Sequence, residues 1–243
     1  MDLRGKNALV TGAGIRVGRA IAHALMREGA NVAVHYHRSE HGARQTAVEG
    51  ETMGRRAPLV QADLADPVAA EALPARAAEA LGGGLDIVVN SAAIMERRPL
   101  QDVTPEDWER TMALNLRAPF FVSKGGAHVL AERGGAIVNI ADLAAFERWA
   151  GYPVHVLSKN GVVVLTELLA RALAPSIRVN AVAPGAVLLP EDWSEDARER
   201  LKVTTPLRRL GSPADVTGAV LYLLRSDYVT GETLVVDGGR RVR

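Results

Sequence analysis

The stretch TGAGIRVG, residues 11–18, decides the fold of this chain. It follows the short apolar run NALV (7–10) and leads into VGRAIAHALMREG (17–29), whose apolar residues recur with helical spacing. A strand, a glycine-rich turn and a helix N-terminus form a pyrophosphate site, because glycine lets the backbone approach phosphates and free N–H groups favour negative charge. The spacing, Gly12, Gly14 and Gly18, differs from GxGxxG, but its place in the first strand–helix unit predicts dinucleotide binding.

The same alternation continues along the chain. Further strand candidates are rich in valine and isoleucine and mostly do not alternate with polar residues, as expected for strands covered on both faces; they are 31–36, 57–62, 86–90, 136–140, 177–183 and 233–237. Helical patterns lie between them, including 105–116 and a long apolar one over 156–174. The pattern predicts one α/β domain over 1–243: a Rossmann-type doubly wound fold whose seven-stranded, mostly parallel sheet carries helices on both faces.

Composition narrows the function. The chain has 243 residues, 48% of them hydrophobic, and a net charge of +1, which suits a globular enzyme and argues against a nucleic-acid partner. The absence of cysteine excludes disulfides, thiolate metal sites and cysteine nucleophiles. The histidines show no metal-binding spacing, so we expect no metal site. The first residues enter a strand without a signal segment, and no apolar run could cross a membrane, so we expect a cytoplasmic protein.

The second strand ends in HYHRS, residues 35–39. Sites that prefer NAD hold the ribose 2′-hydroxyl with an acidic residue here, but no carboxylate ends this strand. Arg38 stands where a 2′-phosphate would lie, His37 and Ser39 add donors, and Arg16 adds a second positive charge. The pattern predicts NADPH rather than NADH, unless Glu40 turns inward. The same residues also fit a solvated loop with Ser39 capping the next helix.

The stretch GYPVHVLSKNG, residues 151–161, carries the candidate chemistry. It places His155 and Lys159 one helical turn apart on one face. An imidazolium is an adequate acid at neutral pH, but the charge of Lys159 disfavours it. Asp142 follows the strand 136–140 at the edge where ligands bind, and its carboxylate would favour the charged ring. Proton donation by His155 therefore depends on whether Asp142 reaches it or only caps a turn.

These residues belong to a longer set of motifs. They include TGAGIRVG, Asp63 in QADL, NSAA at 90–93, Asn115 in LNLRAPF, the segment 142–159, PG at 184–185, RRLGSPADV at 208–216 and VTGETLVVDGG at 229–239. Taken together, the chain resembles the short-chain dehydrogenase/reductase family from end to end. Within it the chain looks most like the pteridine reductases, which carry an arginine at the place of Arg16, HYHRS after the second strand, and an aspartate at the place of Asp142.

The resemblance implies an NADPH-dependent reductase that transfers hydride to a flat pteridine ring, forms homo-tetramers and has no membrane partner. Its matched positions imply roles for individual residues. Asp142, His155, Lys159 and Asn115 would be catalytic, and the substrate would contact Met95 and Trp193 under a lid over 188–205. The residues that would bind NADPH or NADP are Gly12, Arg16, Val17, Gly18, His37, Arg38, Ser39, Asp63, Leu64, Asn90, Lys159, Pro184 and Gly185.

Three positions depart from the family pattern. His155 stands in the place of the catalytic tyrosine, so YxxxK becomes HxxxK, and Tyr152 lies three residues too early to replace it. Met95 stands where pteridine reductases stack the pterin on an aromatic ring, and Trp193 is a possible substitute. Val187 replaces a hydroxyl residue near the cofactor.

Two other functions therefore stay open beside a pteridine reductase. Met95 favours a carbonyl reductase acting on a ketone, a sugar or an acyl-carrier thioester, which Asp142 opposes. His155 favours a weakly catalytic NADPH-binding protein.

Overall fold

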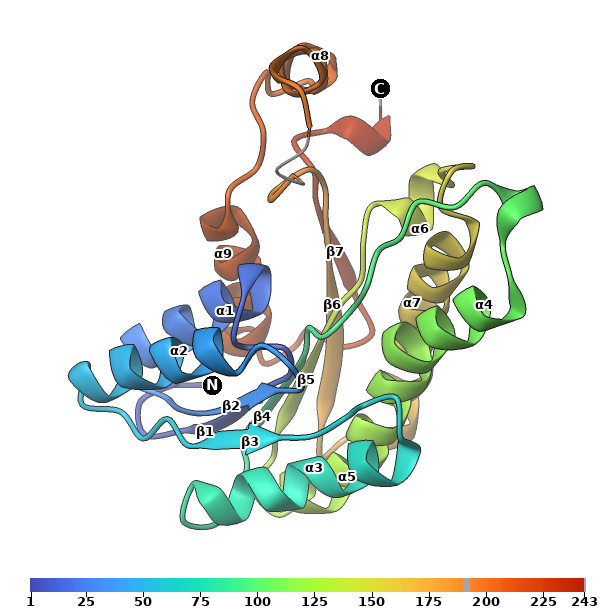
Figure 1. Cartoon of the computed structure of the whole chain (residues 1–243). Helices are drawn as coiled ribbons and strands as arrows, with labels where there is room; N and C mark the ends of the chain where they lie inside the picture. Colours follow the sequence, from blue (N-terminus) through green and yellow to red (C-terminus); the bar gives the residue numbers. More distant parts are fainter. Residues whose placement is uncertain (190–192, 243) are drawn as a thin grey trace.

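The computed structural model describes residues 1–189 and 193–242, and its centre is a sheet of parallel strands (Figure 1). Over these residues the sheet has seven strands in the order β3-β2-β1-β4-β5-β6-β7. Their bounds are β1 Asn7–Val10, β2 Asn31–Tyr36, β3 Leu59–Gln61, β4 Ile87–Asn90, β5 Ala136–Ile140, β6 Arg178–Pro184 and β7 Thr233–Val236. All seven predicted strands are confirmed to within two residues, and every pairing is parallel, where the sequence predicted a mostly parallel sheet.

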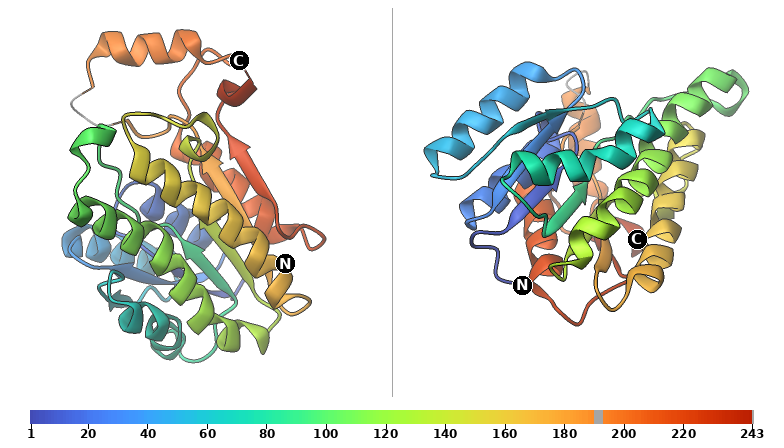
Figure 2. Two further views of the ribbon diagram at one scale, coloured as in Figure 1. Left: turned by 90° about the vertical axis from the view of Figure 1, so that its right-hand side faces the viewer. Right: turned by 90° about the horizontal axis from the view of Figure 1, so that it is seen from below.

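Helices cover both faces of the sheet (Figures 1 and 2). One layer contains α1 (Arg16–Arg27), α2 (Glu40–Thr52) and α9 (Pro213–Arg225). The other contains α3 (Pro67–Ala80), α4 (Pro105–Met112), α5 (Ala118–Ala131) and α7 (Pro153–Leu173). Each layer buries its own apolar cluster against the sheet, which explains why the central strands are apolar on both faces. The doubly wound prediction is confirmed.

Shorter elements complete the chain. They are the π-helical turn η2 (Ala113–Arg117), the 3₁₀ turns η1 (Leu100–Asp102) and η3 (Arg240–Val242), and the helices α6 (Ala144–Glu147) and α8 (Glu195–Thr204). α8 has no buried residue and stands away from the body of the molecule (Figure 2).

The strand order fixes where a ligand can bind. From β1 the chain proceeds outward to β2 and β3, and then returns to place β4 on the other side of β1. In such sheets, ligands bind in the crevice at the carboxyl ends of the strands where the order reverses. The glycine turn leaves β1 at this point, and the segment after β4 leaves it alongside.

Buried amides tie the sheet to the helices below this crevice. Asn90, at the end of β4, donates from Nδ2 to Oδ1 of Asn139 at 2.9 Å and to Oγ of Ser123 at 3.2 Å. Asn139 in turn donates to Thr166 on α7 at 3.0 Å. The amide nitrogen of Asn90 therefore serves the core, while its Oδ1 is buried without a hydrogen-bond partner in the described part of the chain.

The tightest helix contact gives a stability prediction. A Cβ added at Gly125 on α5 would lie 1.9 Å from the carbonyl oxygen of Glu71 on α3, so the two helices would have to separate. We expect Gly125→Ala to lower the free energy of unfolding by about 1–3 kcal/mol, the usual cost of overpacking. Urea unfolding followed by circular dichroism measures this change.

Gly218 on α9 is the matched control, because nothing lies within 4 Å of the place where its Cβ would be. Gly218→Ala should raise the free energy of unfolding by about 0.5–1 kcal/mol, since alanine has the higher helix propensity. Equal effects of the two substitutions would contradict the close approach of α3 and α5.

Candidate active site

The glycine turn has the shape that a pyrophosphate requires. Gly12 has φ +66°, and a Cβ on Gly18 would lie 2.2 Å from the carbonyl oxygen of Gly12. No side chain caps the N-terminus of α1 and its first turn carries no acidic residue, so its N–H groups are open to an anion. Arg16 itself has φ +51°, and its guanidinium donates to the carbonyl of Leu188. These residues fit a dinucleotide phosphate.

His35, at the end of β2, supports this turn from below. Its Nδ1 accepts the N–H of Gly12 at 3.1 Å, and its Nε2 donates to the carbonyl of Ala62 at 3.2 Å. The two bonds hold the ring neutral with its proton on Nε2. The side chain is only 2% exposed, and burial lowers its pKa to about 4. Sequence reasoning missed this role.

The buried His35 makes stability depend on pH. An unfolded histidine binds its proton below about pH 6.5, whereas the folded ring does so only near pH 4, so stability is full above pH 6.5 and falls as the pH is lowered. Between pH 7.5 and 5 this group should remove about 2 kcal/mol from the free energy of unfolding. Urea unfolding at pH 7.5 and pH 5 measures how much free energy of unfolding each protein loses between the two pH values. This loss should be smaller by about 2 kcal/mol in His35→Asn than in the unaltered protein. Equal losses in the two proteins would contradict the assignment.

The loop after β2 is open for a 2′-phosphate. Glu40, the residue that could have undermined this prediction, pairs with Arg44 one turn along α2 at 3.0 Å. Ser39 occupies the N-cap position of α2, but its side chain makes no capping hydrogen bond. Arg38 is exposed and has no ion-pair partner in the described part of the chain. His37 lies 3.7 Å from Asp63, so the two predicted contacts sit side by side.

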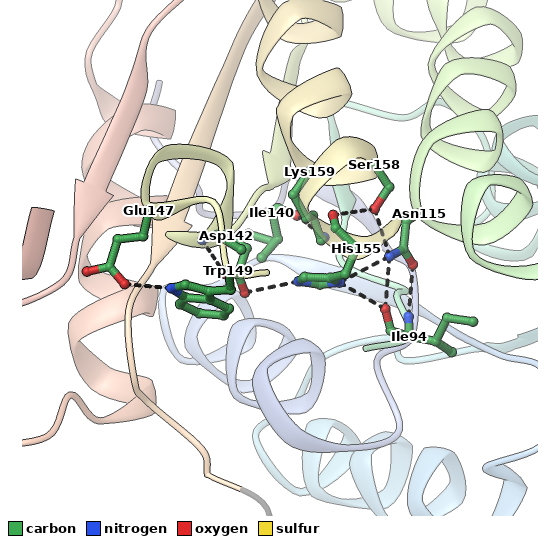
Figure 3. Close-up of polar contacts among 10 residues, drawn as sticks. Ile94, Asn115, Ile140, Asp142, Glu147, Trp149, His155, Ser158 and Lys159 are labelled. Carbon is green, nitrogen blue, oxygen red and sulfur yellow. Dashed lines mark hydrogen bonds and ion pairs between the residues drawn. The ribbon is translucent and has the colours of Figure 1, made fainter. Parts of the chain in front are cut away.

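His155 and Asp142 meet at the head of α7 (Figure 3). Nε2 of His155 lies 3.6 Å from Oδ2 of Asp142, an ion-pair distance longer than a direct hydrogen bond. The other carboxylate oxygen accepts the N–H of Ala144 at 2.7 Å. The structure thus places one oxygen at the turn before α6 and the other facing the imidazole. Tyr152 is the N-cap residue of α7 and lies outside the helix.

The carbonyl of Ile94 fixes the proton on His155. Nδ1 lies 3.2 Å from this oxygen, and a carbonyl only accepts, so Nδ1 carries a hydrogen. In a neutral ring, the Nε2 lone pair would then face a carboxylate, which is repulsive. A proton on Nε2 would convert this repulsion into an ion pair with Asp142. The Ile94 carbonyl carries no side-chain chemistry, and sequence reasoning could not have named it.

Asn115 completes the polar group from a π-helical turn, a geometry often found at functional sites. Its Oδ1 accepts the N–H of Ile94 at 2.9 Å, and its Nδ2 donates to the Ile94 carbonyl at 2.9 Å and to Ser158 at 3.1 Å. Nδ2 also lies 3.4 Å from Nδ1 of His155. Asn115 therefore holds the segment against which His155 rests.

Lys159 lies one turn beyond His155 and is buried. Its Nζ donates to the carbonyl of Ile140 at 2.7 Å, leaving two N–H groups for ligand hydroxyls. Burial lowers its pKa to about 8, and the charge of Asp142 opposes this shift. The structure thus gathers all four predicted catalytic residues around the head of α7.

The remaining predicted residues lie around this group. Leu64 is buried after β3, and Oδ1 of Asp63 accepts the N–H of Ala65 at 3.0 Å. Pro184 ends β6, and a Cβ on Gly185 would lie 2.8 Å from Cα of Asp237, so this turn tolerates only glycine. Val17 is partly buried and packs against the apolar cluster between the sheet and the layer of α1, α2 and α9.

The two predicted substrate residues are less well placed. Met95 is 46% exposed, after the segment held by Asn115. Trp193 precedes α8, and its carbonyl accepts from Arg198 at 3.1 Å. Part of the predicted lid, 190–192, lies outside the described residues.

Two further features concern the described residues, 1–189 and 193–242. No helix among them is long and apolar enough to span a membrane. No group of three potential metal ligands occurs among them.

The chain is similar to known proteins over nearly its whole length. A family model described as enoyl-(acyl carrier protein) reductase matches residues 12–241. L-rhamnose 1-dehydrogenase (NAD(P)(+)) of Sphingomonas sp. is 35% identical over 249 residues, covering 99% of this chain and 98% of that protein. The chain belongs to the short-chain dehydrogenase/reductase family. Members of this family are NAD(P)-dependent oxidoreductases, and this chain is one of them.

Other similar members of the short-chain dehydrogenase/reductase family differ in their named substrates. The 3-oxoacyl-(acyl-carrier-protein) reductase FabG of Staphylococcus aureus is 35% identical over 242 residues, covering 96% of this chain and 97% of that protein. The structure of FolM alternative dihydrofolate reductase 1 from Brucella canis, complexed with NADP, has a TM-score of 0.93 and 30% identity, covering 100% of this chain and 96% of that one. L-rhamnose, a 3-oxoacyl-(acyl-carrier-protein) and dihydrofolate all appear in these names, so the family alone does not identify the substrate.

Proposed function

We propose that this protein is an NADPH-dependent reductase that delivers hydride to a small, flat heteroaromatic substrate of the dihydropterin class. The observation that carries the proposal is the contact between His155 and Asp142 beside the buried Lys159. This contact supplies a proton donor at the place where the family's tyrosine is missing. The aspartate at this position is the feature shared with pteridine reductases, and the similarity to FolM supports the same substrate class.

The cofactor proposal depends on the two ends of the dinucleotide site. The N–H groups of the glycine turn and Gly18 would hold the pyrophosphate, and Arg38, His37 and Ser39 would hold the 2′-phosphate. Lys159, with two free donors, would hold the nicotinamide ribose. When bound, NADPH supplies the hydride; the NADP in the FolM structure accords with this choice.

The residues of this chain would manage the proton. His155 is held by Ile94 through Nδ1, so its Nε2 proton is the one free to move. Asp142 keeps that proton on the ring until a substrate nitrogen or oxygen approaches. Lys159, whose lowered pKa reflects its burial, adds a positive charge that favours release of the proton.

Arg38 gives the sharpest test of the cofactor. Arg38→Ala should raise the Kd for NADPH about tenfold, the lower range for a charged hydrogen bond, and leave the Kd for NADH unchanged. Titration of the protein with each cofactor, followed by cofactor fluorescence, measures both constants. Equal weakening of the two would remove the 2′-phosphate role. Arg27→Ala, which removes an exposed arginine from the last turn of α1, is the control and should leave both constants unchanged.

The function itself is tested by NADPH oxidation at 340 nm with dihydrobiopterin as substrate. We expect turnover with this substrate and much slower turnover with a panel of ketones and sugars. The reverse order would favour the carbonyl reductase, the alternative that the exposed, non-aromatic Met95 supports. Binding of NADPH without turnover of either class would favour the weakly catalytic binding protein, against which the contact between His155 and Asp142 argues.

We also propose the homo-tetramer and the lid over 188–205. Exposed apolar side chains follow the outer faces of α5 and α7 and offer a surface for self-association; they are Phe120, Leu157, Val164 and Leu168. α8 stands above the sheet without buried residues, as a segment that closes on a substrate would. The contact of Arg16 with Leu188 ties the start of this lid to the glycine turn.

A further inference from the structure

Trp149 lies in the loop between α6 and α7, close to the group formed by Asp142 and His155. In Figure 3 its indole lies on the Asp142 side of this pair, with Glu147 beyond it. The side chain is partly buried. Its ring meets that of Tyr152 edge to face, with centroids 6.1 Å apart. Neither the motifs nor the comparisons give Trp149 a role.

Two backbone hydrogen bonds fix this loop, one at the start of α7 and one at the segment that follows Met95. The N–H of Tyr152 donates to the carbonyl of Trp149 at 3.0 Å, just before the turn of α7 that holds His155. The N–H of Arg98 donates to the carbonyl of Gly151 at 2.9 Å, which fixes the loop against the segment that contains Met95. Trp149 is therefore an aromatic ring in a loop whose backbone is bonded to the segment that follows Met95, the position where an aromatic residue was expected.

The indole donates a hydrogen bond to Glu147, which also forms a mostly buried ion pair with Arg240. Its Nε1 donates to Oε2 of Glu147 at 2.6 Å, and the same oxygen accepts from Nη2 of Arg240 at 3.2 Å. The side chains of Arg240 and Glu147 are only 10% and 15% exposed, so water screens this pair less than a surface one. The guanidinium of the next residue, Arg241, lies 5.1 Å from the ring centroid of Phe146. Arg240 and Arg241, two consecutive residues of η3, thus both contact α6, although α6 is far from them in the sequence.

We infer that Trp149 is a substrate-binding residue that offers its indole to the flat ring of the substrate, and that Arg240 is a positioning residue acting through Glu147. This inference rests on the proposed function. An aromatic ring fixed before binding loses little conformational freedom when a substrate stacks on it. The pair of Glu147 and Arg240 provides this fixation, because both hydrogen bonds to Oε2 must persist for the indole to keep its orientation.

The test compares substitutions at Trp149 in the full-length protein. Trp149→Leu should raise the KM for dihydrobiopterin about tenfold, with kcat within about threefold of the original and the Kd for NADPH unchanged. Trp149→Phe keeps an aromatic face and should raise KM less than about threefold. Trp108→Phe is the matched control, because Trp108 lies on the separate helix α4 and is 40% exposed.

Fluorescence provides a direct readout of stacking. The chain has three tryptophans, and oxidised biopterin added to the complex with NADP should quench their emission. The quench should largely disappear in Trp149→Phe and persist in Trp108→Phe. An unchanged quench and an unchanged KM in the Trp149 variants would overturn the assignment.

Arg240 is tested by the same KM measurement. Arg240→Met should raise KM about threefold to fivefold at constant kcat, Arg240→Lys should recover part of the loss, and Glu147→Gln should have a similar effect to Arg240→Met. A variant that lowers kcat and NADPH binding together would indicate a merely structural role and overturn the positioning assignment. If the unaltered protein neither binds nor reduces a pterin, the proposed function fails as well; if it does both and Trp149→Leu changes nothing, only this inference fails.

Discussion

Replacing His155 by phenylalanine should lower kcat for NADPH-dependent reduction by about 10² to 10⁴, the usual contribution of a positioned acid. The ring volume is nearly retained, but the proton that faces Asp142 is lost, and so is the bond to the Ile94 carbonyl. NADPH should bind as before, because Lys159 and the glycine turn are unaltered. Single-turnover rates and cofactor titration measure the two quantities separately.

A tyrosine at the same position is the informative partner of this variant. A phenol also carries an acidic proton, so His155→Tyr should recover most of the activity that His155→Phe loses. Because a phenol ordinarily has a pKa near 10 and an imidazole one near 6.5, the rate should also persist to higher pH. Unchanged kcat in His155→Phe would show that the imidazole donates no proton, and the weakly catalytic reading would then gain support.

Much of the fold follows from the sequence because the central strands are apolar on both faces. The run over 31–36 matches β2 residue for residue, and the glycine turn marks the start of α1. The ends of the strands are predicted less accurately, because backbone hydrogen bonding rather than hydrophobicity determines where a strand begins and ends. The run over 57–62, for example, is a strand only over Leu59–Gln61. The sequence predicts a mostly parallel sheet, and all the observed pairings are parallel. They can be, because every connection between consecutive strands contains a helix that returns the chain to the same end of the sheet.

The site was predictable as a set of residues but not as a geometry. Sequence spacing alone places His155 and Lys159 on one face of a helix. It cannot place Asp142 within reach of His155, because two different elements meet there. The contacts missed entirely are those of backbone groups and of residues far apart in sequence. The bond from His35 to Gly12 and the link from Arg240 to Glu147 have no local pattern.

Replacing Asp142 by asparagine should lower kcat about tenfold to a hundredfold at pH 7. The substitution keeps an oxygen that can accept the N–H of Ala144, so the turn before α6 remains capped. It removes the negative charge 3.6 Å from Nε2 of His155, and an opposite charge close to an ionisable group favours its charged form. Without the carboxylate the ring loses this support as a proton donor, so turnover should slow.

Cofactor binding separates this explanation from a structural one. Asp142→Asn should leave the Kd for NADPH unchanged while kcat falls, whereas a distorted site would also bind NADPH more weakly. Asp66→Asn is the matched control, because Asp66 caps α3 through the same contact with the N–H two residues on, at 2.9 Å. It should leave kcat unchanged. If Asp142→Asn showed the unaltered kcat, the ion pair would have no part in turnover.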